Sequence, residues 1–125
     1  MHYVEVVAML AVVQYLFFGA LVGRARGRSG LKAPAVSGDE GFERIYRVQM
    51  NTLELLVAFL PALLVAAGFW PAPWVAGLGA VYLLGRLLYW RAYVAAPATR
   101  GLGFALSMLP TLVLLAMALA GAVLR

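Results

Sequence analysis

Four long apolar stretches divide the chain. Each is close to the roughly 20 residues that an α-helix needs to cross about 30 Å of hydrocarbon. Only one connection, residues 23–41, is long, and its glycines and proline predict irregular structure at the membrane surface. The pattern therefore predicts one all-α integral membrane domain over residues 1–125. We expect a four-transmembrane-helix bundle with helices over approximately residues 3–22, 44–68, 74–96 and 98–124.

The composition supports a membrane protein and removes several kinds of chemistry. Of the 125 residues, 65% are hydrophobic and 12% are charged, and the mean hydropathy is +0.92, far above that of a soluble domain. The chain has no cysteine, and its one histidine is His2. Thiolate and histidine metal sites, a cysteine nucleophile and a Ser-His-Asp triad are therefore excluded, and we expect no metal. Thiol chemistry would need a thiol from a cofactor.

The net charge of +5 is distributed by loop, so we attribute it to a membrane and expect no nucleic acid as a partner. The connection over residues 69–74 carries no charge, whereas the basic residues cluster around the first and third connections. The positive-inside rule then places those connections in the cytoplasm and both termini on the non-cytoplasmic side. A composition rich in alanine, glycine and arginine points to a bacterial inner membrane.

The entrance of the second span carries polar groups that are costly in a bilayer. The segment Phe42–Glu54 reads FERIYRVQMNTLE. At about 100° per residue, Arg47, Asn51 and Glu54 fall within roughly 60° on one helix face, while Gln49 points almost the opposite way. A site shared between subunits would use one face from each copy, and four helices enclose little interior of their own. The spacing therefore predicts a homo-oligomer with a shared polar site.

A second polar stripe runs along the third span. Tyr82, Arg86, Tyr89 and Tyr93 recur at four, three and four residues and so share a face. One interpretation is an interfacial tyrosine belt with a snorkelling Arg86. The other is a pocket formed with the second span, whose guanidinium, carboxylate, amide and hydroxyl groups suit a zwitterionic, peptide-like ligand.

Arg100 lies where the fourth span begins. Pro97 suits the first position of that helix, which would place Arg100 in the opening turn. The helix dipole disfavours a cation there, and a bound anion would reverse this effect. A thiolate or carboxylate next to Arg100 would be stabilised, and the pKa of a thiol would fall below its usual value of about 8.5. The alternative is a topogenic arginine that only follows the positive-inside rule.

The segments FERIYRVQMNTLE and YLLGRLLYWRAY, followed by Arg100, resemble the family of membrane-associated proteins in eicosanoid and glutathione metabolism, known as MAPEG. The resemblance covers essentially the whole chain. It implies a homotrimer that binds glutathione between adjacent subunits near the cytoplasmic face. It also implies that Arg100 is the catalytic residue that stabilises the glutathione thiolate.

In the leukotriene C4 synthase and microsomal glutathione transferase branch, the matching positions of one subunit that hold glutathione are Arg47, Asn51, Glu54, Tyr89 and Tyr93; we add Arg86 of the same stripe. Gln49 and either Arg24 or Arg26 would come from the neighbour. The chain departs from this branch at Leu55, where the branch has a tyrosine. Its first-loop arginines are also spaced Arg24-x-Arg26-x-Arg28 rather than adjacent.

The leading hypothesis is a membrane glutathione transferase that activates the glutathione thiolate for attack on lipophilic electrophiles arriving from the lipid, with glutathione peroxidase as a second activity. An alternative is a non-catalytic lipid-binding member similar to the 5-lipoxygenase-activating protein. A remote alternative from another class is a small multidrug transporter, which would use a first-span carboxylate such as Glu5.

Overall fold

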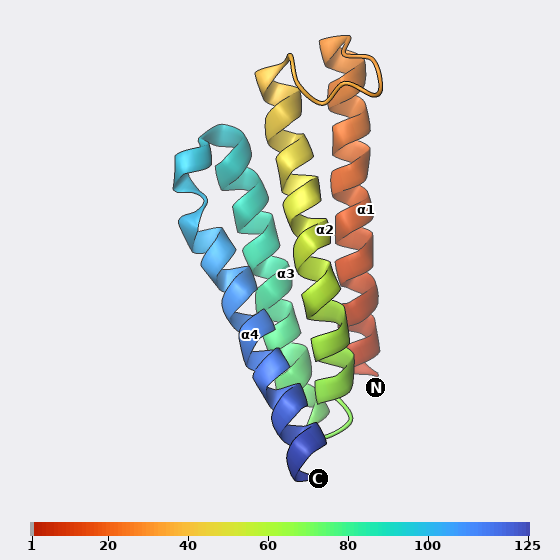
Figure 1. Cartoon of the computed structure of the whole chain (residues 1–125), viewed down its shortest axis with the longest axis vertical. Helices are drawn as coiled ribbons and strands as arrows, with labels where there is room; N and C mark the ends of the chain where they lie inside the picture. The colour runs from red at the N-terminus through yellow and green to blue at the C-terminus, as the bar shows by residue number, and fades with distance from the viewer. Residues whose placement is uncertain (1) are drawn as a thin grey trace.

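The computed structural model describes residues 2–125 as an up-and-down bundle of four long helices (Figure 1). Both termini lie at one end of the bundle, which we call the terminal end. All four helices are long and apolar enough to cross a membrane. The elements are α1 (Tyr3–Ser29), α2 (Glu40–Ala66), α3 (Ala72–Ala95), the short 3-10 helix η1 (Pro97–Thr99) and α4 (Gly101–Leu124).

The first two helices are longer than the hydropathy pattern predicts. The connection expected to be irregular from residue 23 is helical through Ser29, where Gly30 ends the helix in the left-handed conformation with φ 73°. The prediction was wrong here because arginine interrupts an apolar run and yet is a good helix former. On the other side of the connection, α2 begins at Glu40, with Asp39 as its N-cap: the Asp39 carboxylate accepts a hydrogen bond of 2.9 Å from the Phe42 amide.

The fourth helix begins later than predicted. Pro97 opens the short η1 turn, and Arg100 is the N-cap of α4 rather than a residue of its first turn. The extended backbone of Ala96 separates η1 from α3. The expectation that Pro97 starts the fourth helix is therefore wrong by one turn, although Arg100 still lies at the N-terminus of α4.

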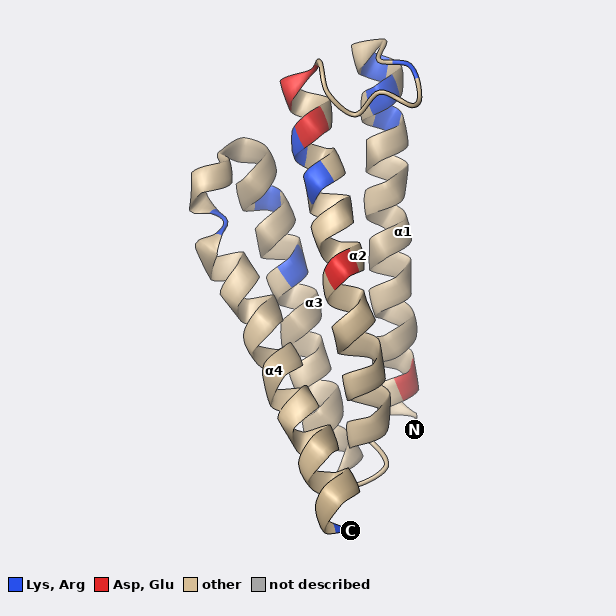
Figure 2. Ribbon diagram, viewed as in Figure 1, with Lys and Arg blue, Asp and Glu red and all other residues tan. Residues whose placement is uncertain are grey.

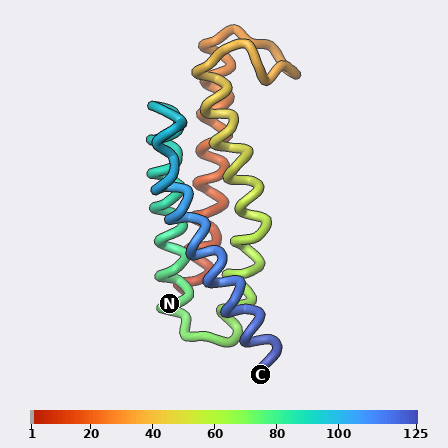
Figure 3. The backbone as a smooth tube through the Cα atoms, turned by 60° about the vertical axis from the view of Figure 1, so that its left-hand side comes forward, coloured from red at the N-terminus to blue at the C-terminus, as the bar shows by residue number. Residues whose placement is uncertain are grey.

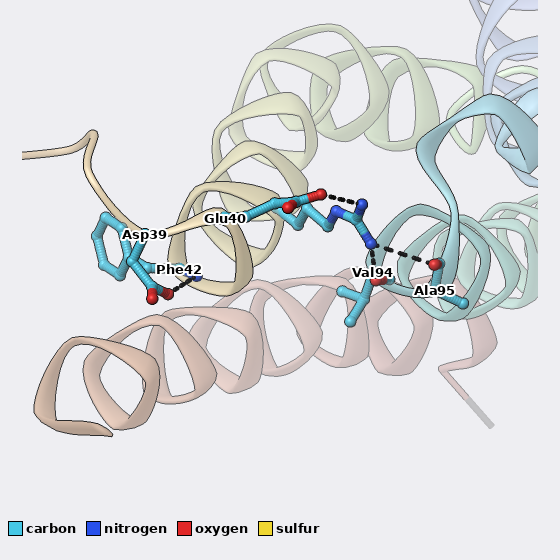
Figure 4. Close-up of polar contacts among 6 residues, drawn as sticks. Asp39, Glu40, Phe42, Val94 and Ala95 are labelled. Carbon is cyan, nitrogen blue, oxygen red and sulfur yellow. Dashed lines mark hydrogen bonds and ion pairs between the residues drawn. The ribbon is translucent and has the colours of Figure 1, made fainter. Parts of the chain in front are cut away.

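Most basic residues gather at the end of the bundle opposite the termini, which we call the basic end (Figure 2). Here α1 and α2 extend beyond the turn that joins α3 to α4, so the bundle has a step (Figures 1 and 3). Arg44 connects α2 to the end of α3 at this step. It pairs with Glu40 and donates hydrogen bonds of 3.0 and 3.1 Å to the Val94 and Ala95 carbonyls at the end of α3 (Figure 4).

Helices α3 and α4 approach so closely that glycine is required between them. A Cβ added at Gly85 would lie 2.6 Å from the Leu106 carbonyl carbon and 2.6 Å from the Ser107 amide nitrogen. Backbone atoms cannot move aside as a flexible side chain does. Small residues at helix contacts are the usual means of close packing in membranes.

We expect Gly85→Ala to lower the stability of the bundle by about 1–3 kcal/mol, because the methyl group would push α3 and α4 apart. Gly77→Ala is the matched control on the same helix, since nothing lies within 4 Å of a Cβ at that position. This control should be neutral or stabilising by up to about 1 kcal/mol. Reversible unfolding in mixed detergent and dodecyl sulfate micelles measures both. Equal effects of the two substitutions would contradict the close approach.

Candidate functional site

Arg86 is the centre of a polar network inside the bundle. Its side chain on α3 is 0% exposed. One terminal nitrogen, Nη1, donates to Asn51 Oδ1 at 2.7 Å and to Thr52 Oγ1 at 3.2 Å. The other, Nη2, donates to Ser107 Oγ at 2.8 Å. The interpretation of Arg86 as a snorkelling residue is therefore wrong, because its guanidinium instead joins α2, α3 and α4.

This network separates two apolar clusters. Tyr82 belongs to the cluster nearer the terminal end and stacks on Phe59 at 3.7 Å between ring centroids, whereas Tyr89 belongs to the cluster at the basic end. Among residues 2–125 the ion pairs are His2–Glu5 and Glu40–Arg44, so no described carboxylate lies within 4 Å of Arg86. The hydrogen-bond partners of the Arg86 guanidinium are therefore the neutral oxygens of Asn51, Thr52 and Ser107.

A row of aromatic and basic groups leads from Arg86 toward α4. The Arg86 guanidinium lies 4.3 Å from the centre of the Tyr89 ring, and the Tyr89 and Tyr93 rings stack at 5.5 Å. The Arg100 guanidinium lies 6.0 Å from the Tyr93 ring and donates a hydrogen bond of 2.9 Å to the Pro97 carbonyl. Arg100 itself is exposed. The residues predicted on α3 and at the start of α4 thus form one continuous arrangement.

A groove between α2 and α4 begins next to Arg86, at its partner Asn51. Its volume is about 280 Å³. Asn51 and Glu54 line it on α2 together with the apolar Leu55, and Phe104 lines it on α4 within 6.4 Å of the Tyr89 ring centre. Because α2 and α4 both run from the basic end, the groove continues toward the terminal end along the deeper members Ala58, Met108, Thr111, Leu112 and Leu115. A polar entrance at Asn51 and Glu54 therefore leads into a mostly apolar groove.

The two faces of α2 differ in what they contact. Asn51 faces α3, while Gln49 lies against α1, where its Nε2 would come within 2.9 Å of a Cβ at Gly19. Arg47 and Glu54 are exposed on the surface of the bundle. The opposite orientation of Gln49 and Asn51, predicted from helical spacing, is present in the structure.

The candidate arginines of α1 also point in different directions. The Arg26 guanidinium lies 4.6 Å from the Phe42 ring centre and donates to the Ala35 carbonyl at 2.8 Å. At about 100° per residue, Arg26 lies on the same face of α1 as Gly19, and this is the face that meets Gln49 of α2. Arg24 lies on another side of α1 and lines a cavity next to α3. The structure thus separates two residues that the sequence left as alternatives.

Thr52 and Ser107, both buried partners of Arg86, were missed by the sequence reasoning, as was Phe104. A signal for Ser107 exists: Gly103, Ser107 and Thr111 recur every four residues in an otherwise apolar span, and all three are buried. Such a stripe of small and polar residues is typical of a helix contact in membranes. It does not by itself reveal that an arginine lies across the contact.

Known proteins resemble this chain over most of its length. A sequence model of the MAPEG family matches residues 4–120. Microsomal glutathione S-transferase 2 of Mus musculus is 37% identical over 117 residues, which cover 90% of this chain and 80% of that protein. An uncharacterised protein of Synechocystis sp. is 46% identical over 113 residues, covering 90% and 82%. Leukotriene C4 synthase of Bos taurus is 38% identical over 87 residues, covering 70% and 58%.

These matches agree with the four membrane-spanning helices and with the motif on α2. The family model alone covers far more than half of the chain. The chain is therefore an integral, multi-pass membrane protein that belongs to the MAPEG family.

Proposed function

We propose that this protein is a membrane glutathione transferase, which activates the thiol of glutathione and joins glutathione through its sulfur to lipophilic electrophiles. The observation that carries the proposal is the polar entrance at Asn51 and Glu54, which opens into an apolar groove and adjoins the row from Tyr89 to Arg100. A hydrophilic tripeptide and a lipid-soluble partner need two such environments side by side. The similarity to microsomal glutathione S-transferase 2 and leukotriene C4 synthase supports the same function.

The groups at the entrance match the charges of glutathione. Arg47 is exposed and free to form a forked contact with a carboxylate, and Glu54 is exposed to receive an ammonium group. Asn51 is held by Arg86 with its Oδ1 as the acceptor, which leaves its amide N–H groups to donate to the ligand. We assign Tyr89 and Tyr93 to the wall beside the ligand. Arg86, which is fully buried, would act through Asn51 and Tyr89.

Arg100 is the proposed catalytic residue. Its guanidinium is exposed at the N-terminus of α4. An anion bound there is stabilised by the positive charge of Arg100 and by the dipole of α4. Arg100 would therefore hold the thiolate form of glutathione. The thiolate sulfur attacks an electrophilic carbon, a carbon–sulfur bond forms, and the leaving group departs with the electron pair of its bond. Lipid hydroperoxides are a second class of electrophile for the same sulfur.

We propose that the site is completed by a neighbouring subunit in a homotrimer. Gln49 points from α2 toward α1, away from the side of α2 on which Asn51 meets Arg86, and we assign Gln49 and Arg26 to the site of the neighbouring copy. Arg26 is preferred to Arg24 because, of the two, only Arg26 lies on the face of α1 that carries Gly19 and meets Gln49 of α2. The remote transporter interpretation has little support, since Glu5 lies near the terminal end and 3.4 Å from His2.

Mixed oligomers test the shared site. Arg47→Ala and Gln49→Ala subunits should each fail to bind glutathione alone, and a random one-to-one mixture of them should recover about a quarter of the wild-type sites in any cyclic assembly. Isothermal titration calorimetry with glutathione counts the sites.

The matched control is the double variant Arg47→Ala, Gln49→Ala mixed one-to-one with wild type. A shared site again gives about a quarter of the sites, whereas a site within one subunit gives about half. No recovery in the first mixture together with half the sites in the control would reject the shared site.

A further inference from the structure

A second cavity lies at the basic end, on another side of α1 from the proposed glutathione site. Its volume is about 360 Å³, and it is formed by the last turns of α1, the start of α2 and the last turns of α3. Arg24 and Arg28 line it from α1, and Trp90 and Val94 line it from α3. Because Val94 is in the last turn of α3, the cavity lies on the step where α1 and α2 extend beyond the α3–α4 turn (Figures 1 and 3).

The two arginines of this cavity have no ionic or hydrogen-bonding partner among residues 2–125. Among the described residues, neither Arg24 nor Arg28 forms an ion pair or donates a side-chain hydrogen bond, in contrast to Arg26 and Arg44. Both are exposed. The one carboxylate in the lining, Asp39, caps α2 through the Phe42 amide. Two unpaired guanidiniums therefore leave the cavity with an excess of positive charge.

Below the arginines the same side of α1 is apolar and accessible to lipid. At about 100° per residue, Val13, Phe17 and Leu21 lie on the face of Arg24 and Arg28. Val13 is 58% exposed and Phe17 is 44% exposed. Phe17 also meets Trp90 edge-on, with 5.5 Å between the ring centres. An apolar strip that ends in two arginines matches a molecule with a hydrocarbon chain and an anionic head.

We propose that this cavity binds an anionic phospholipid, with its phosphate between Arg24 and Arg28 and an acyl chain along Phe17 and Val13. Forked guanidiniums are well suited to phosphate oxygens. An anionic lipid fits better than a zwitterionic one, because the Trp90 ring is already flanked by Phe17, Phe18 and the Arg91 guanidinium, which lies 5.4 Å from its centre. A choline group would meet a cation there instead of an open aromatic face.

Native mass spectrometry of the detergent-solubilised protein, without glutathione, tests this site. Phosphatidylglycerol should be retained about thirtyfold better than phosphatidylcholine with the same acyl chains, as expected for two arginines near one headgroup. Glycerol phosphate, the soluble headgroup, should not displace the bound lipid. Equal retention of the two lipids by the wild-type protein would overturn the proposal, and displacement by glycerol phosphate would mean that the site takes a free phosphate.

Substitutions inside and outside the cavity locate the lipid. Arg28→Gln should lower the preference about fivefold, and the double variant Arg24→Gln, Arg28→Gln should abolish it. Lys32→Gln removes one charge at the same end but does not line the cavity, so it should keep the preference. If Lys32→Gln lowers the preference for phosphatidylglycerol as much as Arg28→Gln does, diffuse surface charge explains the binding and the site is rejected. Both arginines are exposed, and unchanged circular dichroism verifies the fold.

Discussion

Replacing Arg100 with alanine should raise the pKa of bound glutathione by one to two units and reduce turnover in proportion. The physical reason is the loss of the guanidinium that favours the thiolate at the N-terminus of α4. Each pKa unit corresponds to about 1.4 kcal/mol, so the thiolate population near neutral pH should fall by roughly ten- to a hundredfold. Ultraviolet difference spectra of the thiolate and turnover of a chlorodinitrobenzene measure the two quantities.

The affinity for glutathione should fall much less than the rate, because Arg47, Asn51 and Glu54 remain in place. Arg100→Lys should retain part of the effect, since it keeps the charge and loses the planar fork. Arg91→Ala is the matched control, because Arg91 is another exposed arginine of the basic end that lies outside the proposed site. If Arg100→Ala leaves both the thiolate absorbance and the turnover intact, Arg100 is a topogenic charge and Arg26 becomes the next candidate.

Replacing Arg86 with lysine should destabilise the bundle by about 3–5 kcal/mol, as expected for a buried charge that loses its partners. The guanidinium reaches Asn51 and Thr52 from one nitrogen and Ser107 from the other, across three helices. A single ammonium group cannot occupy both positions. Unfolding in dodecyl sulfate micelles measures the loss.

Arg86→Met separates charge from packing. It removes the charge together with the hydrogen bonds, and Ser107 already donates to carbonyls of its own helix, so its hydroxyl is not left without a partner. We therefore expect Arg86→Met to be more stable than Arg86→Lys, while its glutathione affinity still falls because Asn51 is no longer oriented. A methionine variant less stable than the lysine variant would show that the hydrogen bonds, and not the buried charge, decide the outcome.

Hydropathy and helical periodicity predict much of this architecture. Four apolar stretches are sufficient to predict four spans, and a rotation of about 100° per residue separates Gln49 from Arg47 and Asn51. The helix ends are less predictable, because the arginines of residues 24–28 break the apolar pattern without breaking the helix. The start of α4 was missed because Pro97 is equally compatible with a separate 3-10 turn.

The contacts between helices could not be predicted from one span at a time. Arg86 was correctly placed on the face of Tyr82 and Tyr89, but the question of whether it reaches water or another helix depends on which helix lies opposite. Ser107 supplies the answer from a helix 21 residues further along the chain. The different surroundings of Arg24 and Arg26 likewise depend on which side of α1 meets α2, which the contact between Gly19 and Gln49 shows.

The partners of Arg86 have a consequence for how the chain enters the membrane during synthesis. Of the four spans, α3 is the least apolar, and an arginine near the centre of a span costs about 2.5–3.5 kcal/mol on insertion scales. Thr52 and Asn51 are inserted before Arg86, but Ser107 is made later. An α3 helix that enters the bilayer without α4 would therefore lack the hydrogen bond from Arg86 to Ser107. An α3–α4 hairpin, packed together at Gly85 and Gly103, brings Ser107 into the bilayer with Arg86. We expect the translocon to release these two helices together, as a pair, against an α1–α2 pair that is already in the bilayer.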